Sequence, residues 1–454
     1  MNRQLPVVVI GAGPIGLAAA AHLLARGMQP LVLEAGPSAG AGIGRWKQVK
    51  MFSPWHYSID AAAAELLSQT DWVPPPADAY PTGAELVTEY LQPLAAVKAI
   101  ADALRLNARV TAVSRQQRDL MSDSDRSNLP FVVRYVDTHG EHDVLARAVV
   151  DASGTIEQPN PLGGSGIRAL GESAAAERIY YGIPDVANDL RERYEGKRVL
   201  VVGSGHSAFN VLADLTDLAE SNPATRVHWA LRRPAIERVL GGGENDQLIE
   251  RGKLGMRIAA LIESGLVQLH SGFSLQRIER RPGSLTVHGL DRSLQEVDEI
   301  IACTGFRPDL NLLSEVRLDL DPATQSPRAL APLIDPNQHS CGSVRAHGAV
   351  ELKQPERDLY IVGMKSYGRA PTFLLATGYE QVRSVVAAID GDWQAARRVE
   401  LLLPETGVCI TQFSSSAGAD KAVPASCCGN NSNDCACGPR TTQAKPSKAA
   451  SCCG

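Results

Sequence analysis

The sequence predicts an α/β fold with two Rossmann-like, three-layer dinucleotide-binding domains, one inserted in the other, and a disordered cysteine-rich C-terminal tail. Two glycine-rich segments carry this prediction, GAGPIG at Gly11–Gly16 and GSGHSA at Gly203–Ala208. Each follows a β-branched apolar run, Val7–Ile10 or Val199–Val202, and each opens a segment of helical pattern. The third observation is a change of composition near Ser414, after which apolar residues almost disappear. Such a tail cannot bury enough surface to fold alone.

The spacing within each glycine-rich segment suits a dinucleotide. The first glycine permits a tight turn, and the second lets the backbone approach a pyrophosphate. The third position needs a small residue so that the helix can pack against the strand. The N-terminus of that helix offers N–H groups and the positive end of its dipole to the phosphates. Two such units predict two bound dinucleotides and electron transfer between them.

The residue that ends the second strand of each unit distinguishes the two dinucleotides. The strand Leu31–Leu33 is followed by Glu34, whose carboxylate accepts hydrogen bonds from ribose hydroxyls and repels a 2′-phosphate. The strand Val227–Leu231 is followed by Arg232 and Arg233, whose guanidinium groups suit a 2′-phosphate by charge and bidentate geometry. We therefore expect FAD at the first unit and NADPH at the second.

The order of strand patterns predicts a discontinuous first domain. Strand-like runs at 300–306 and 359–363 follow the second unit and are expected to complete the first domain. The predicted boundaries are 1–190 and 288–395 for the FAD-binding domain, 191–287 for the NADPH-binding domain, and 396–454 for the C-terminal extension, disordered from about 414.

Composition excludes several classes of protein. A chain of 454 residues is long enough for two or three domains with a large core. The net charge of −5, from 45 basic and 50 acidic residues, disfavours a nucleic-acid surface. No stretch reaches the ~20 apolar residues of a membrane helix, and the run Leu5–Ile10 is too short for a signal peptide. We expect a cytoplasmic protein with no nucleic-acid or membrane partner, and a homodimer is left open.

Two further motifs accompany the glycine-rich segments, VVDASGT at 149–155 and CTGFRPD at 303–309. With the strand-end residues, this combination resembles the flavin monooxygenases that bind FAD and NADPH, a group with relatives of thioredoxin reductase, over about residues 1–395. The resemblance implies that NADPH reduces FAD and that the reduced flavin captures O₂ as a C4a-hydroperoxide. One departure is RIYYGIPDV at 178–186, where the FxGxxxHxxx(Y/F) signature of Baeyer–Villiger and related monooxygenases is absent. The resemblance therefore does not specify the substrate or the residues that stabilise the hydroperoxide.

The resemblance also assigns individual residues to the cofactors. It implies that Val110 contacts the FAD adenine through its backbone. Arg45 is expected to pair with FAD phosphates or to lie in solvent, and Trp46 to stack near the flavin or to pack. His206 is expected to face phosphate or solvent rather than to act as an acid or base. The complete set of expected cofactor contacts is Gly11, Gly13, Pro14, Gly16, Glu34, Arg45, Trp46, Val110, Gly154, Gly203, Gly205, His206, Ser207, Arg232, Arg233, Thr304, Gly305 and Gly363.

The cysteines indicate a soft substrate. Thiolates are soft ligands, and vicinal pairs fit zinc poorly but can wrap trivalent arsenic or antimony, Hg(II) or Cu(I). A tail with no partner is the alternative. Flavin monooxygenases of arsenic-resistance operons oxidise trivalent arsenicals or antimonite, and this core with a thiol-rich tail resembles them. The six expected ligands are Cys427, Cys428, Cys435, Cys437, Cys452 and Cys453.

The remaining cysteines favour an oxygenase over a dithiol reductase. Neither the loop Gly40–Trp46 nor the segment 194–287 contains the cysteine pair that a flavin disulfide reductase needs. Cys341 is the candidate thiol for receiving substrate, Cys303 is expected in the core, and Cys409 is expected to pack. We predict an NADPH-dependent FAD monooxygenase that oxidises arsenite, methylarsenite or antimonite to the pentavalent form for detoxification. A soft-metal or thiol reductase, a monooxygenase of an organic sulfur or nitrogen substrate, and a metalloid-sequestering protein remain open.

Overall fold

The computed structural model describes residues 4–234, 236, 249–337, 344–371 and 373–401. Cys341, Cys409 and the six tail cysteines lie outside these described residues. The predictions made for them therefore stay predictions.

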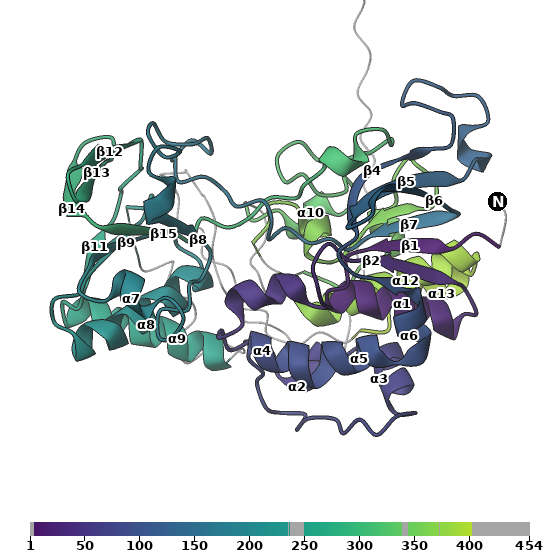
Figure 1. The fold of residues 1–454 in the computed structure, drawn as a ribbon, viewed down its shortest axis with the longest axis horizontal. Helices are drawn as coiled ribbons and strands as arrows, with labels where there is room; N and C mark the ends of the chain where they lie inside the picture. The colour runs from purple at the N-terminus through teal and green to yellow at the C-terminus, as the bar shows by residue number, and fades with distance from the viewer. Residues whose placement is uncertain (1–3, 235, 237–248, 338–343, 372, 402–454) are drawn as a thin grey trace, which may run out of the picture. The chain divides into compact units, whose positions relative to one another are not determined.

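The first sheet has five parallel strands in the order β16-β7-β1-β2-β3 (Figure 1). Alternate residues of β1 face opposite sides of the sheet. Val7 and Val9 pack with helices α1 and α12, whereas Val8 and Ile10 pack with an antiparallel sheet of three strands, β4-β5-β6. The result is a helix layer, a parallel sheet and an antiparallel sheet. The strands are β1 Val7–Ile10, β2 Pro30–Leu33, β3 Leu104–Arg105, β4 Arg109–Arg115, β5 Phe131–Asp137, β6 Gly140–Ala146, β7 Ala148–Asp151 and β16 Leu359–Ile361.

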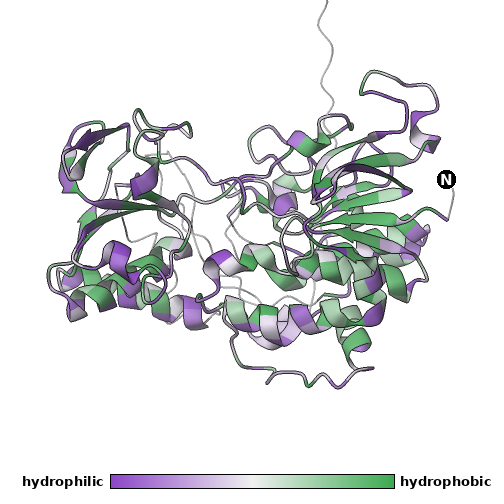
Figure 2. Ribbon diagram, in the orientation of Figure 1, coloured by the Kyte–Doolittle hydropathy of each residue, from purple (hydrophilic) through white to green (hydrophobic). Residues whose placement is uncertain are grey.

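Hydrophobic residues concentrate in the strands of this sheet (Figure 2). This distribution is expected for parallel strands that are covered on both faces. The helices are α1 Pro14–Ala25, α2 Trp55–Ser58, α3 Ala61–Leu67, α4 Gly83–Glu85, α5 Gln92–Ala96, α6 Lys98–Ala103, α10 Ala331–Ile334, α11 Ala349–Leu352, α12 Leu375–Asp390 and α13 Trp393–Arg397. Between them lie the 3₁₀ helices η1 Ala41–Trp46, η3 Arg126–Asn128, η6 Asn311–Leu313 and η7 Gly363–Tyr367, and the π-helix η2 Leu86–Leu91.

The second sheet repeats this plan with five parallel strands in the order β11-β10-β9-β15-β8. Val199 and Val201 of β9 pack with helices α8 and α9, and Leu200 and Val202 pack toward β13. The elements are β8 Ile179–Tyr181, β9 Arg198–Val202, β10 Arg226–Ala230, β11 Val267–His270, β12 Arg277–Arg281, β13 Ser284–His288, β14 Ser293–Val297, β15 Glu299–Ala302, α7 Arg191–Tyr194, α8 His206–Ser221, α9 Ile249–Glu263 and η4 Ala176–Arg178.

The boundaries 191 and 287 of the second domain are corrected by this pairing. β8 and β15 lie outside that range, yet Ile300 of β15 pairs with Leu200 on one side and Ile179 on the other. A buried parallel strand is a short apolar run in either sheet, so its sequence does not say which sheet it joins. The first sheet resumes later, with β16 beside β7.

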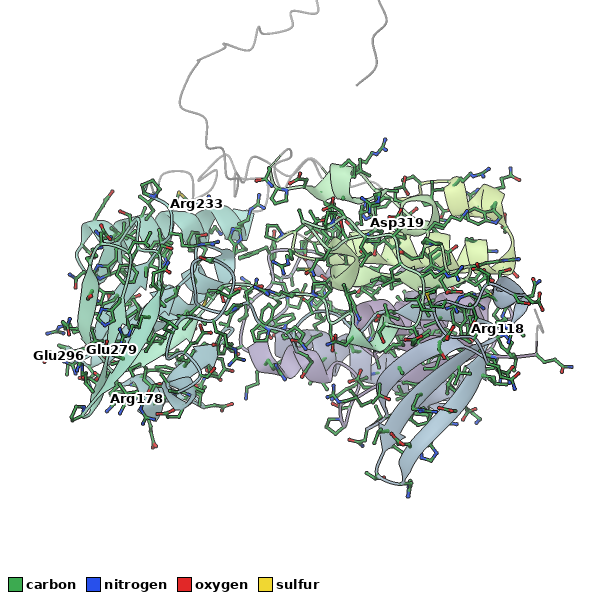
Figure 3. The ribbon with its side chains drawn as sticks, turned by 90° about the horizontal axis from the view of Figure 1, so that it is seen from above. Arg118, Arg178, Arg233, Glu279, Glu296 and Asp319 are labelled. Carbon is green, nitrogen blue, oxygen red and sulfur yellow. The ribbon has the colours of Figure 1, made fainter. Side chains whose placement is uncertain are left out.

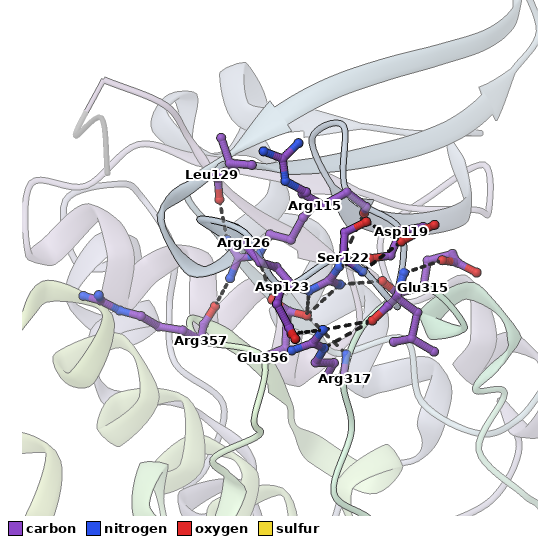
Figure 4. A network of polar contacts seen from close by, with 12 residues as sticks. Arg115, Asp119, Ser122, Asp123, Arg126, Leu129, Glu315, Arg317, Glu356 and Arg357 are labelled. Atoms are coloured by element: carbon purple, nitrogen blue, oxygen red, sulfur yellow. Dashed lines mark hydrogen bonds and ion pairs between the residues drawn. The ribbon is translucent and has the colours of Figure 1, made fainter.

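A buried cluster of charges joins the antiparallel sheet to the segment before β16 (Figure 4). Glu356 lies 2.8 Å from Nε of Arg115 and 2.9 Å from Nη2 of Arg126. These side chains are at most 5% exposed. Both guanidinium groups also donate to backbone carbonyls, which include that of Leu129. Removing one member would leave a buried charge without its partner, so we regard this cluster as a structural clamp.

The helices within the described ranges include none that is both long and apolar enough to cross a membrane.

Candidate functional site

A cavity of about 780 Å³ opens at the carboxyl ends of the strands of the first sheet. Gly11 follows β1, Glu34 follows β2, Ala152 follows β7 and Gly363 follows β16, and all four line the cavity. Parallel α/β sheets bind their ligands at this edge. The predicted residues that line the cavity are Gly11, Gly13, Pro14, Glu34, Arg45, Trp46, Val110, Gly154, Ser207 and Gly363.

The first glycine-rich turn has the geometry of a phosphate cradle. Gly11 has φ +97°, and a Cβ there would lie 2.9 Å from the carbonyl oxygen of Ala152. A Cβ at Gly16 would lie 1.9 Å from the carbonyl oxygen of Gly11, so α1 packs directly on the turn. A Cβ at Gly13 would meet nothing within 4 Å. α1 begins at Pro14, and no described side chain caps it, so its first N–H groups suit a pyrophosphate.

Glu34 is fixed at this turn by two backbone groups. Its Oε2 accepts a hydrogen bond from the N–H of Ala12 at 2.6 Å, and its Oε1 accepts one from Gly36 at 2.7 Å. A carboxylate oxygen has a second lone pair, so each oxygen retains acceptor capacity for a ribose hydroxyl. This arrangement fits the ribose of FAD and disfavours a 2′-phosphate.

Arg45 borders the cavity in an ion pair. Its Nη2 lies 2.7 Å from Oε1 of Glu157, and its Nη1 donates to the carbonyl oxygen of Ile156 at 3.2 Å. Both charged side chains are about half exposed. Arg45 therefore lies at the cavity with about half of its side chain in solvent, and both alternatives for its role stay predictions.

Thr304 and Gly305 do not line the cavity. Thr304 Oγ1 donates to the carbonyl oxygen of Asn160 at 2.6 Å, and the Asn160 amide donates back to the carbonyl of Thr304 at 3.0 Å. These two residues therefore shape the pair of segments that connect the sheets. The neighbouring Phe306 and Asp309 line the cavity instead.

The second glycine-rich turn follows the same design. Gly203 has φ +137°, and a Cβ there would lie 2.1 Å from the carbonyl oxygen of Cys303. Trp229 Nε1 donates to the carbonyl of Gly203 at 2.7 Å. A Cβ at Gly205 would meet nothing within 4 Å, and α8 begins at His206 with no described side chain as its cap. This turn is therefore also open to a pyrophosphate.

The basic residues after β10 lie where the second-strand residue of a dinucleotide unit belongs. Arg232 is exposed and donates from Nη1 to the carbonyl oxygen of Gly164 at 2.9 Å. Arg233, which Figure 3 labels, is partly buried, and its carbonyl accepts a hydrogen bond from the N–H of Gly272. The His206 ring meets the ring of Phe52 edge-on, with centroids 5.2 Å apart. Phe52 lines the cavity, which brings the second turn next to it.

Several lining residues were missed by the sequence reasoning. Tyr181 donates to Oε1 of the buried Glu172 at 2.5 Å, and burial raises the pKa of Tyr181 well above its ordinary value. The phenol therefore stays protonated. Ser153, in the VVDASGT motif, lines the cavity and contacts Lys365 and Asp151. That motif was the available signal for Ser153, whereas nothing in the sequence pairs it with Lys365.

Cys303 is the one cysteine among the described residues, and it is buried. Its Sγ donates to the carbonyl oxygen of Gly182 at 3.4 Å, and burial raises the pKa of its thiol. It does not line the cavity. In the described part of the chain, no group of three or more His, Cys, Asp or Glu residues is placed to hold a metal ion.

The model of the family described as pyridine nucleotide-disulphide oxidoreductase matches residues 8–342. A ferredoxin–NADP reductase of Salinispora arenicola is 27% identical over 320 residues, which cover 70% of this chain and 79% of that protein. The bacillithiol disulfide reductase of Bacillus cereus has a TM-score of 0.61 at 20% identity, covering 87% of this chain and 99% of that one. The FAD-bound cadaverine monooxygenase of desferrioxamine biosynthesis from Erwinia amylovora has a TM-score of 0.60 at 16% identity, covering 92% and 100%. Both solved structures share the fold of this chain.

Proposed function

The chain belongs to the pyridine nucleotide-disulphide oxidoreductase family, and we propose that it is an NADPH-dependent FAD monooxygenase that oxidises a trivalent metalloid. The chain is a flavoprotein oxidoreductase that uses FAD and NAD(P)H. The proposal adds the preference for NADPH, the use of O₂ and the class of substrate. Candidate substrates are arsenite, methylarsenite and antimonite.

The observation that carries the proposal is the absence of cysteine from the described lining of the cavity. A disulfide reductase passes electrons from the flavin to a nearby cysteine pair. Cys303 is the one described cysteine, and it is buried with its Sγ bonded to a backbone carbonyl. Transfer from the flavin directly to a small molecule needs no such pair, and O₂ is the small molecule that a monooxygenase uses.

The residues around the cavity bind and orient the reactants. Gly13 opens the turn to a pyrophosphate, and Glu34 accepts from a ribose. Trp46, Phe52 and Phe306 contribute aromatic surface to the lining, which excludes water from the reacting centre. Bound FAD would accept a hydride from NADPH and supply the electron pair that reduces O₂. One oxygen atom of O₂ would bond to the lone pair of the trivalent metalloid, and the other would leave as water after taking up the hydrogen of the hydride and one proton from solvent.

The sequence of the C-terminal tail supports a metalloid as the substrate. Its six cysteines, in the pattern CC, CxC and CC, supply closely spaced soft ligands. We propose that the tail captures the metalloid and delivers it to the flavin, with Cys341 as the candidate thiol on the way. All of these cysteines lie outside the described residues.

A second candidate is a reductase of a soft metal ion or of a small disulfide. The structural likeness to a bacillithiol disulfide reductase favours it at the level of the fold. Such an enzyme would consume NADPH with the metal or disulfide under anaerobic conditions, whereas the monooxygenase needs O₂.

The test uses the full chain loaded with FAD. NADPH oxidation and O₂ uptake are followed with arsenite, methylarsenite and antimonite, and the arsenic or antimony species are separated afterwards. We expect O₂ uptake that depends on the metalloid and a pentavalent product in equal amount. A matched chain with the six tail cysteines replaced by serine should need a higher metalloid concentration for the same rate. Uptake without metalloid dependence would contradict the proposed substrate.

A further inference from the structure

A buried ion pair lies directly behind the wall of the FAD cavity. Lys365 Nζ is 2.6 Å from Oδ2 of Asp151, and both side chains are fully buried. Burying two charges costs hydration energy, so such a pair is weak evidence for stability. Because the pair lies behind the cavity wall, we looked for its contacts with the residues that line the cavity.

The pair holds a residue of the cavity wall. Oδ1 of Asp151 accepts from the backbone N–H of Ser153 at 3.1 Å and from its hydroxyl at 2.7 Å. Lys365 Nζ donates to the same hydroxyl oxygen at 3.0 Å. These bonds form a closed ring of three side chains, which fixes the Ser153 rotamer. Ser153, Gly154 and Thr155 line the cavity after β7.

The same lysine belongs to the neighbouring turn, which follows the adjacent strand β16. Lys365 lies on η7, which begins with Gly363 and Met364, and both of these line the cavity after β16. The N–H of Gly363 donates to Oε1 of the buried Gln381 from α12 at 2.7 Å. Buried polar contacts thus anchor η7 to α12, and those of Lys365 link it to the turn after β7.

We propose that Lys365 is a positioning residue for FAD. Through Asp151 and Ser153, its ammonium group holds the 153–155 turn and the Gly363–Met364 turn in the relative arrangement that binds the dinucleotide. This inference depends on FAD as the cofactor and is independent of the oxidised substrate.

The first test compares Lys365→Met with Glu356→Gln. Both substitutions break a buried ion pair, but Glu356 pairs with Arg115 and Arg126 and does not line the cavity. The dissociation constant for FAD is measured on the apoprotein by quenching of flavin fluorescence, and unfolding is followed in urea. We expect Lys365→Met to weaken FAD binding at least about tenfold. Glu356→Gln should destabilise the fold while keeping the dissociation constant within about twofold.

A double variant separates positioning from stability. Lys365→Met with Asp151→Asn removes both charges, so no unpaired charge remains buried and the free energy of unfolding should recover. Methionine cannot donate to Ser153, so FAD binding should stay weak. Recovery of affinity together with stability would overturn the proposal, and so would FAD binding by Lys365→Met that matches the unchanged protein.

Ser153→Ala keeps the proposal testable if Lys365→Met fails to fold. It removes one hydroxyl and leaves the ion pair intact. We expect severalfold weaker FAD binding with nearly unchanged unfolding. FAD binding equal to that of the unchanged protein would overturn the role of Ser153. In the combined variant, the two losses should be less than additive, because both act through one contact.

Discussion

The two glycine-rich turns share one backbone design but differ at the third position and at the end of the second strand. Gly16 occupies the third position of the first turn, where Ala208 stands in the second. Glu34 ends the second strand of the first unit, where Arg232 and Arg233 follow that of the second. The shared backbone identifies a dinucleotide, and the differing side chains indicate which one.

The third position also differs in packing. A Cβ at Gly16 would lie 1.9 Å from a backbone oxygen, whereas Ala208 is fully buried with its methyl group in place. α1 therefore approaches its turn too closely for any side chain, and α8 leaves room for one carbon. A swap of the two residue types should therefore destabilise the first unit much more than the second.

Gly16→Ala should have the largest effect. The new methyl group meets backbone that cannot move without opening the turn, so we expect a loss of roughly 3 kcal/mol or more in the free energy of unfolding and purification without FAD. Ala208→Gly is the matched change in the second unit and should cost about 1 kcal/mol, the helix preference of alanine over glycine. Urea unfolding and flavin absorbance check both. Equal losses of stability in the two variants would show that α1 and α8 do not differ in how closely they pack on their turns.

Glu34→Ala should weaken FAD binding roughly 10- to 100-fold. It leaves the N–H groups of Ala12 and Gly36 without their acceptor and removes the candidate ribose contact, a loss of about 1–3 kcal/mol. Fluorescence titration of the apoprotein measures it. Glu34→Gln retains one oxygen acceptor, so its dissociation constant for FAD should lie between those of the unchanged protein and Glu34→Ala. An unchanged dissociation constant in Glu34→Ala would remove Glu34 from the site.

Replacing Arg232 and Arg233 by alanine should act on the second dinucleotide alone. A charge-assisted contact contributes about 1.5–3 kcal/mol, so the KM for NADPH should rise roughly 10- to 100-fold. The KM for NADH and the FAD content should stay the same. Steady-state kinetics with both nucleotides provide the measurement. A parallel rise in both KM values would show that these arginines do not select the 2′-phosphate.

The smallest expected effect is a loss of folding stability in the second unit at acidic pH. His270 Nε2 lies 3.2 Å from Nδ1 of His228, and burial, followed by the charges of His228 and Arg292, lowers the pKa of His270 to about 4. The unfolded chain binds this proton near pH 6.5. Stability is therefore complete above about pH 6.5 and falls as the pH decreases toward 4. Because His270 is only partly buried, we expect a loss of only about 1 kcal/mol.

His270→Gln should flatten this dependence. Urea unfolding at pH 7.5 and pH 5, monitored through the buried Trp229 of β10, compares the two chains. The same slope in both chains would place the acid sensitivity elsewhere.

The fold could be predicted because its signals are local. Each glycine-rich turn has a strand before it and a helix after it, and the strand-end residues lie within the same unit. The positions of β8 and β15 could not be predicted, because pairing between distant apolar strands leaves no mark in either strand. The domain boundaries were misplaced for that reason.

Site residues within a sequence motif could be predicted. Contacts between residues that are distant in the sequence could not. Glu34 and Gly13 line the cavity, whereas Thr304 and Gly305 form hydrogen bonds with Asn160 on the other connecting segment. The contact between Lys365 and Asp151 joins residues more than two hundred positions apart. The spacing of residues in the sequence cannot predict a contact over such a separation.

In the proposed reaction, electrons pass from the second dinucleotide to FAD and then directly to O₂, without a cysteine pair. Anaerobic titration of the FAD-loaded full chain with NADPH tests it most directly, with flavin absorbance as the readout. We expect complete flavin reduction by one equivalent of NADPH per FAD, followed by rapid reoxidation when O₂ is admitted. A requirement for a second equivalent before the flavin is fully reduced would reveal a redox-active disulfide and contradict it.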